Sequence, residues 1–326
     1  MKVYVTRRIH EKGLNMLRDK GYDVVVNPED RVHTKPELIA ALLAERPDAL
    51  LALLTDSIDN EVLDAAPQLK VIANYAVGFD NIDLESAKRR NLPVTNTPSD
   101  AVSDSVAEFT FGMMLCLAHR LHEADAFTRA GRYQGWDPYL FNGILLKGRT
   151  LGVIGLGRIG ADVVKHSWGI GMKVCYHDVK QNPDFEKQYD AKFLSQEELL
   201  KTADVISLHV PLIPSTRHLL SDKEFALMKP TAIVINTSRG PCVDEKAVLK
   251  ALYEKKLGGF ATDVFECEPS LDCDPYDHME LKALPNVLLT PHIASATEEA
   301  RADMSKVAAD NIIAVFEGKT PPNLAK

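Results

Sequence analysis

The sequence predicts an α/β protein of two doubly wound parallel-sheet domains, one inserted into the other. Three observations predict this fold class. Strand-like and helix-like segments alternate over roughly the first hundred residues, the alternation restarts at Thr150, and a Gly-x-Gly-x-x-Gly loop stands near the middle of the chain. At 326 residues the chain is longer than a single hydrophobic core usually organises, so two domains are expected.

The first alternating stretch predicts a parallel sheet with helices on both faces. Strands are expected at 2–6, 23–27, 49–54, 70–75 and 93–95, and helices at 11–20, 35–45, 60–66 and 84–90. Pro98 then breaks the pattern, because it disfavours helix at Thr97. A long helix is expected from near Ser103, and its segment from Phe109 to Ala118 is apolar almost all round, which predicts a buried helix.

The second alternating stretch predicts the inserted domain. Its strands are expected at 151–154, 174–176, 205–209, 232–236, 259–263 and 287–289, and a final helix at about 297–317. We assign residues 100–290 to a dinucleotide-binding domain and residues 1–99 and 291–326 to a discontinuous second domain, to which the last helix returns.

The glycine loop follows an apolar run that ends at Ile154. It reads Gly155-Leu156-Gly157-Arg158-Ile159-Gly160, and helical apolar spacing, a second strand-like run and Asp178 come after it. The first glycine allows a tight turn, the second lets the backbone approach a pyrophosphate, and the third lets the helix pack on the strand. The N–H groups at the helix start favour an anion. Strand, turn, helix, strand and acid in this order predict a dinucleotide site.

The position of Asp178 predicts which nicotinamide cofactor is used. A carboxylate at the end of the second strand accepts hydrogen bonds from the ribose hydroxyls and repels a 2′-phosphate. NAD is therefore favoured over NADP, although Lys180, two residues further on, softens that repulsion.

Composition and charge exclude several classes of partner. The net charge of −8 argues against general binding to nucleic acid or to a membrane surface. No apolar run approaches the roughly 20 residues of a membrane span, and the N-terminus has no signal-peptide core. The cysteines lack metal-ligand spacing, so we expect no metal site and reduced thiols in a cytoplasmic protein. They are Cys116, Cys175, Cys242, Cys267 and Cys273.

Three polar segments follow late strands of the predicted inserted sheet, and they contain Arg239, Glu268 and His292. In an open α/β sheet ligands bind beyond the carboxyl ends of the strands, so these side chains are expected to converge. Their types suit reduction of a 2-oxo acid. Arginine holds a carboxylate with two parallel hydrogen bonds, histidine protonates the carbonyl oxygen, and glutamate orients the imidazole and favours its protonated form.

These motifs resemble those of the D-isomer-specific 2-hydroxyacid dehydrogenases along nearly the full chain. The matching stretches are Gly155–Gly160, Asn236–Gly240, Asp263–Pro269 and Pro291–Ile293. The resemblance implies a Rossmann NAD-binding domain inserted into a flavodoxin-like substrate domain, with Arg239, Glu268 and His292 as the catalytic residues. It also implies that Asp263 holds the nicotinamide carboxamide. The implied cofactor-binding residues are Gly155, Gly157, Arg158, Ile159, Gly160, Asp178, His209, Val210, Pro211, Thr237, Ser238, Asp263 and Ser295.

Within that family, the stretch from Asn74 to Asp83 is most similar to the glyoxylate/hydroxypyruvate reductase branch. The resemblance implies a small unphosphorylated 2-oxo or 2-hydroxy acid as substrate, with the backbone N–H groups of Val77 and Gly78 gripping its carboxylate opposite Arg239. It also implies a homodimer, in which the arm around Trp136 reaches the neighbouring subunit.

Two alternatives stay open at this point. Phosphite dehydrogenases share a similar Gln-Gly-Trp stretch, which is Gln134–Trp136 here. A non-catalytic NAD-sensing corepressor on the same fold can keep the catalytic residues. A phosphoglycerate dehydrogenase is disfavoured, because Leu53-Leu54-Thr55-Asp56 stands where those enzymes carry an arginine for the phosphate.

Overall fold

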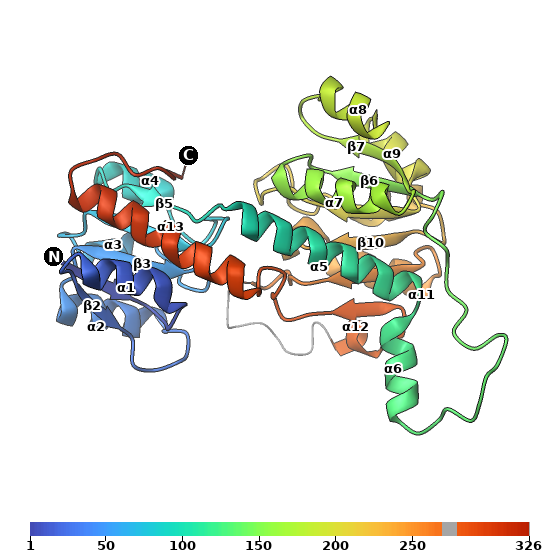
Figure 1. The fold of residues 1–326 in the computed structure, drawn as a ribbon, viewed down its shortest axis with the longest axis horizontal. Helices are drawn as coiled ribbons and strands as arrows, with labels where there is room; N and C mark the ends of the chain where they lie inside the picture. Colours follow the sequence, from blue (N-terminus) through green and yellow to red (C-terminus); the bar gives the residue numbers. More distant parts are fainter. Residues whose placement is uncertain (269–278, 326) are drawn as a thin grey trace. The chain divides into compact units, whose positions relative to one another are not determined.

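The computed structural model describes residues 1–268 and 279–325. The chain forms two compact units (Figure 1), one of Met1–Val102 with Ala296–Lys326 and one of Ser103–Ser295. Pro269 and Cys273, which the sequence interpretation named, lie outside the described residues.

The first unit is built on a parallel sheet of five strands in the order β2-β1-β3-β4-β5. This is the flavodoxin-like order. The strands consist mostly of Val, Leu, Ile and Ala and are largely buried, as expected of a parallel sheet covered on both faces. They are β1 (Lys2–Val5), β2 (Asp23–Val26), β3 (Ala49–Leu53), β4 (Val71–Tyr75) and β5 (Val94–Thr95).

Helices cover this sheet in two groups. Leu42, Leu63 and Ala87, from three different helices, share one apolar core with the strands. The helices are α2 (Lys35–Glu45), α3 (Asn60–Asp64) and α4 (Leu84–Arg89). A second pair is α1 (Glu11–Asp19) and α13 (Glu298–Phe316), which come from opposite ends of the chain. They touch where the Gly13 N–H donates to Ser305 Oγ at 2.9 Å.

The second unit contains a parallel sheet of seven strands in the order β12-β11-β10-β9-β6-β7-β8. Its first six strands in sequence have the Rossmann order, and β12 extends the edge. The strands are β6 (Thr150–Ile154), β7 (Lys173–His177), β8 (Lys192–Phe193), β9 (Val205–Leu208), β10 (Ile233–Asn236), β11 (Gly259–Thr262) and β12 (Val287–Leu289). The two parallel sheets confirm the predicted fold class.

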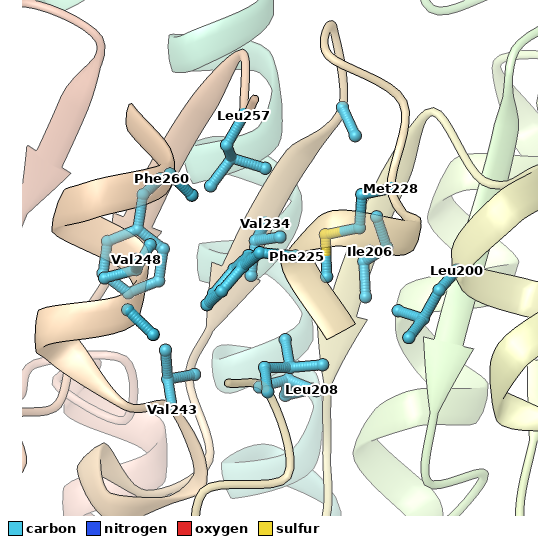
Figure 2. Packing of buried hydrophobic residues seen from close by; sticks show 14 of the residues in the cluster. Leu200, Ile206, Leu208, Phe225, Met228, Val234, Val243, Val248, Leu257 and Phe260 are labelled. Atoms are coloured by element: carbon cyan, nitrogen blue, oxygen red, sulfur yellow. The ribbon is translucent and has the colours of Figure 1, made fainter. Parts of the chain in front are cut away.

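Alternate residues of these strands enter separate cores on the two faces of the sheet. Val234 of β10 packs with Phe225, Val248 and Phe260 (Figure 2), whereas its neighbour Ile235 belongs to the other core. The helices around the first core are α9 (Gln196–Thr202), α10 (Asp222–Leu227), α11 (Glu245–Tyr253) and α12 (Met279–Ala283). Those around the second are α5 (Asp100–Ala118), α7 (Arg158–Gly169) and α8 (Pro183–Tyr189).

The predicted strands are confirmed to within one residue at each end, and the final helix is confirmed as well. The strand β8 was not predicted, because the charged Lys192 interrupts the apolar residues around it. The long helix begins at Asp100, three residues before Ser103. Between Phe109 and Ala118 half of the residues are buried and only Gly112 is exposed, so the predicted buried helix is confirmed.

Helix α5 also corrects the expectation about apolar runs. By length and composition Asp100–Ala118 is able to cross a membrane, and it is the one such helix among the described residues. Yet 56% of its most apolar 18-residue stretch is buried inside the fold, as in the core helix of a globular domain.

The cysteines require a second correction. Cys116, Cys175 and Cys242 are free thiols, and burial raises the pKa of Cys175 to about 12. Cys267 is disulfide-bonded, so the interpretation of every cysteine as a reduced thiol is wrong. Disulfide formation depends on the separation of two Cα atoms, which sequence spacing does not reveal.

Candidate active site

The glycine loop joins β6 to α7 at the carboxyl edge of the second sheet. Gly155 has φ of 94°, and a side chain there would overlap the His209 carbonyl oxygen. A Cβ at Gly160 would overlap the Gly155 carbonyl oxygen, but one at Gly157, the N-cap of α7, would meet no atom within 4 Å. The two outer glycines therefore serve the fold, while Gly157 opens space at a helix N-terminus. That space fits a pyrophosphate.

Asp178 directly follows β7 and is fixed beside the glycine loop. Its Oδ2 accepts a hydrogen bond from the Leu156 N–H at 2.6 Å, and its Oδ1 accepts one from the Val179 N–H at 2.6 Å. Asp178 stays partly exposed, and Arg158, the first residue of α7, is exposed. The carboxylate is thus held at the end of the second strand, where a ribose is expected to lie.

The segment after β9 lies against the same loop. The backbone N–H of His209 donates to the Ile154 carbonyl at 2.8 Å, and the His209 ring nitrogen Nε2 lies 2.8 Å from Ser207 Oγ. Desolvation lowers the pKa of His209 to about 3, so its ring is neutral near pH 7. Val210 is partly exposed and Pro211 is exposed beside it. These residues line one side of the predicted cofactor site and carry no charge there.

Arg239 follows β10 in an extended conformation, with φ of −144° and ψ of 139°. The Asn236 side chain shapes this loop, because its Nδ2 donates to the Arg239 carbonyl at 2.9 Å and its Oδ1 accepts from the Ser238 N–H at 3.1 Å. The guanidinium Nη1 donates to the Ser238 carbonyl at 2.8 Å. The sequence therefore fixes Arg239 through a buried asparagine three residues earlier.

Glu268 and His292 form a close pair, although they are far apart in the sequence. The distance from His292 Nδ1 to Glu268 Oε2 is 2.6 Å, and each side chain is about one quarter exposed, at 27% and 26% respectively. The contact uses Nδ1, so Nε2 is the ring nitrogen that can transfer a proton to a substrate.

The turn that carries His292 is held by Asp263. His292 adopts the left-handed conformation with φ of 55°, which is strained for a residue with a side chain. Asp263 is fully buried, and its carboxylate accepts from Thr290 Oγ1 at 2.6 Å and from the N–H groups of Ile293 and Ala294 at 2.9 and 2.7 Å. These three hydrogen bonds fix the turn. A contact between Asp263 and the nicotinamide stays a prediction.

Parallel pairing explains why the late segments share one edge. Strands β10, β11 and β12 are neighbours in the sheet, and Arg239, Glu268 and His292 each follow one of them. Ser295 ends the second unit and is partly exposed.

Sequence interpretation missed Thr110 of α5, whose Oγ1 lies 2.8 Å from Oγ1 of the predicted cofactor residue Thr237. No local pattern marks a contact between residues 127 positions apart.

Val77 and Gly78 belong to the first unit, in the loop after β4. Their carbonyl oxygens accept from Asn96 Nδ2 at 2.6 Å and Asn74 Nδ2 at 2.9 Å. Their predicted contact with a substrate is untested. Within residues 1–268 and 279–325, no group of three or more His, Cys, Asp or Glu side chains is arranged to hold a metal ion.

Comparisons with known proteins agree with this geometry. The model of the D-isomer specific 2-hydroxyacid dehydrogenase NAD binding domain matches residues 111–294. The glyoxylate reductase of Thermococcus litoralis is 45% identical over 99% of this chain and 96% of its own. The TT0316 protein of Thermus thermophilus is 41% identical, with a TM-score of 0.90 and full coverage of both chains.

A more distant structure is the NADPH-dependent glyoxylate/hydroxypyruvate reductase of Sinorhizobium meliloti. It is 27% identical, with a TM-score of 0.84 over 99% of this chain and 97% of that one. The family and branch predicted from the motifs are confirmed. This chain belongs to the D-isomer specific 2-hydroxyacid dehydrogenases, and it is an oxidoreductase that uses a nicotinamide cofactor.

Proposed function

We propose that the protein reduces small unphosphorylated 2-oxo acids of the glyoxylate and hydroxypyruvate type to the corresponding 2-hydroxy acids with NADH. The observation that carries this proposal is the 2.6 Å contact between His292 Nδ1 and Glu268 Oε2. These residues follow β12 and β11, and Arg239 follows β10, the next strand in the sheet. The relative from Thermococcus litoralis, 45% identical, is a glyoxylate reductase, which supports the substrate class.

Each of the three residues has its own role in the reaction. The Arg239 guanidinium binds the substrate carboxylate with two hydrogen bonds. His292 donates a proton from Nε2 to the carbonyl oxygen as negative charge develops there, and Glu268 stabilises the imidazolium before that transfer. The nicotinamide, when bound, supplies the hydride to the carbonyl carbon. In the oxidative direction His292 accepts the proton from the hydroxyl group.

A steady-state screen tests this function. The wild type is expected to oxidise NADH with glyoxylate and hydroxypyruvate, and His292→Asn is expected to lower kcat by about 10²- to 10⁴-fold, the usual contribution of a general acid. His10→Asn is the matched control, because His10 likewise pairs with a glutamate, Glu298 at 2.9 Å, and belongs to no predicted site. If no 2-oxo acid is reduced, the proposal is wrong.

The same screen separates the two alternatives. Reduction of NAD by phosphite would assign the enzyme to phosphite oxidation instead. NADH-dependent capture of a partner protein, without turnover of any acid, would indicate a sensor. The expected cytoplasmic location stays a prediction.

We also propose NAD rather than NADP as the preferred cofactor. Asp178 supports this preference, because its carboxylate lies at the end of β7 and is tied to the glycine loop at 2.6 Å. The preference needs its own measurement, because the Sinorhizobium meliloti relative is NADPH-dependent. Asp178→Ala is expected to narrow the ratio of kcat/KM for NADH over NADPH by at least about 10-fold, since it removes the charge that repels a 2′-phosphate. An unchanged ratio would show that another residue distinguishes the ribose of NADH from the 2′-phosphorylated ribose of NADPH.

A homodimer completes the proposal. The arm between α6 (Leu121–Arg129) and β6 exposes large apolar side chains, among them Trp136 at 84% and Tyr139 at 83%. Exposed apolar surface of this kind marks an interaction site, and a second copy of the chain is the partner that we propose.

A further inference from the structure

Three titratable side chains outside the proposed catalytic set surround the turn that carries Glu268. They are Glu245, at the start of α11, Glu266, in the turn itself, and His218, in the segment before α10. We propose that Glu245, with Glu266 and His218, forms a clamp that positions the Phe265–Glu268 turn so that Glu268 meets His292. The clamp residues are positioning residues, and the inference rests on the proposed function.

The Glu245 carboxylate hydrogen-bonds to the backbone of the turn. Its Oε1 accepts a hydrogen bond from the Glu266 N–H at 2.7 Å, and only 9% of Glu245 is exposed. A hydrogen bond to an ionised acceptor in a water-poor place is stronger than a neutral one. The carboxylate also stands at the N-terminus of α11, where the helix dipole favours negative charge. Glu245 thus anchors the turn at Glu266, two residues before Glu268.

The Glu266 side chain ties the turn to two further elements. Its Oε1 lies 2.6 Å from Nε2 of His218, and its Oε2 accepts from the Glu245 N–H at 3.4 Å. The carboxylate of Asp244 lies 3.9 Å from the other ring nitrogen of His218. The histidine therefore stands between two carboxylates and links them.

His218 is itself fixed by its backbone. Its N–H donates to the Pro241 carbonyl at 2.7 Å, and it adopts a left-handed conformation with φ of 49°. Non-glycine residues in this region persist where the surrounding structure holds them. The imidazole is therefore presented to Glu266 by a strained and anchored segment.

The turn is confined on its other side as well. A Cβ at Gly240 would overlap the Phe265 carbonyl oxygen, so the residue after Arg239 packs directly on this turn. The Glu268 N–H donates back to the Phe265 carbonyl at 3.1 Å, which closes the turn. A displacement at Glu266 is therefore transmitted to Glu268 and to its contact with His292.

Substitution of Glu245 tests the clamp. Glu245→Ala is expected to lower kcat for glyoxylate reduction by about 10- to 100-fold with KM for NADH nearly unchanged, because a small misplacement of a catalytic group costs this much. Glu245→Gln keeps an oxygen acceptor for the Glu266 N–H, so it is expected to restore kcat to within about threefold of the wild type.

The matched control is Glu198→Ala. Glu198 accepts from the Ser195 N–H at 3.1 Å and from Ser195 Oγ at 2.7 Å at the start of α9, in the same unit. Glu198→Ala is expected to leave kcat unchanged. A loss of kcat in Glu245→Ala alone then reflects the position of Glu268 and not a general loss of stability.

A measurement without turnover accompanies the kinetics. In Glu245→Ala the amide of Glu266 is expected to exchange with deuterium faster, and the ring ¹⁵N resonances of His292 are expected to shift as the contact with Glu268 loosens. If Glu245→Ala keeps kcat within twofold of the wild type, or if Glu245→Gln does not restore it, the clamp is refuted. If the wild type reduces no 2-oxo acid, the proposed function fails, and unchanged exchange at Glu266 then refutes the clamp separately.

Discussion

Buried polar side chains, more than exposed ones, shape the loops of this site. Asn236 fixes the loop of Arg239 through hydrogen bonds at 2.9 and 3.1 Å, and the fully buried Asp263 holds the turn of His292. A buried carboxylate or amide without hydrogen-bond partners destabilises the folded protein by more free energy than its hydrogen bonds contribute when they form. The loops therefore adopt the conformations that keep these hydrogen bonds. The chemistry proposed for the partly exposed Arg239 and His292 side chains therefore depends on buried partners.

Gly157 offers a prediction at the scale of one residue. A methyl group there meets no protein atom within 4 Å, so Gly157→Ala is expected to fold with a melting temperature close to that of the wild type. The methyl group occupies the space into which a pyrophosphate would come, so Kd for NADH is expected to rise by at least about 10-fold. Isothermal titration calorimetry with NADH measures the affinity.

Gly160→Ala is the companion variant. Its methyl group overlaps the Gly155 carbonyl oxygen, so it is expected to lower the melting temperature instead. If Gly157→Ala binds NADH with the same Kd as the wild type, this loop does not bind the pyrophosphate.

Between elements, the crossing of α1 and α13 joins the two chain segments of the first unit. A Cβ at Gly13 would overlap the Ser305 carbonyl oxygen, and the Ser305 hydroxyl donates to the His10 carbonyl at 2.6 Å. The helices pack backbone to backbone at this point. Glycine is needed here for close approach and not for a turn.

Gly13→Ala is therefore expected to destabilise the protein by about 1–3 kcal/mol, the usual cost of overpacking a tight contact. Thermal and urea unfolding measure the change. Gly169→Ala, at the end of α7, is the control, because a Cβ there meets nothing within 4 Å and glycine costs helix stability. Equal stability of the two variants would show that the α1–α13 crossing relaxes to admit a methyl group.

The positions of the strands could be predicted from patterns of apolar residues, and two strands illustrate the physical reason. A strand such as β3 is a continuous apolar run, and burial on both faces of the sheet produces that pattern. The two-residue β8 shows no such pattern, and it is defined by the pairing of Lys192 and Phe193 with Cys175 and Tyr176 of β7.

For the molecule as a whole, the exposed arm before β6 gives the main prediction. We expect the wild type to elute with twice the 36.0 kDa of one chain, and the double variant Trp136→Ser/Tyr139→Ser to elute as a monomer. The physical reason is the loss of apolar surface from two side chains that are more than 80% exposed in the single chain. Size-exclusion chromatography with light scattering measures the mass.

Trp168→Ser is the control for this experiment. Trp168 is also exposed, at 50%, but it packs edge-on against Tyr189 within its own chain. It is expected to leave the mass of the assembly unchanged. A monomeric wild type, or a double variant that stays dimeric, would overturn the proposed role of the arm.

The sequence by itself determined the family, the fold class, nearly all strands and the residues proposed for chemistry. These follow from local patterns, because the glycine loop, the apolar runs and the short polar motifs each lie within a few neighbouring residues. Tertiary structure alone decided the role of Asp263 in the His292 turn and the contacts of Glu245 and His218 with Glu266. These contacts join residues about 20 to 50 positions apart, and only the parallel order of the strands brings them to one edge of the sheet.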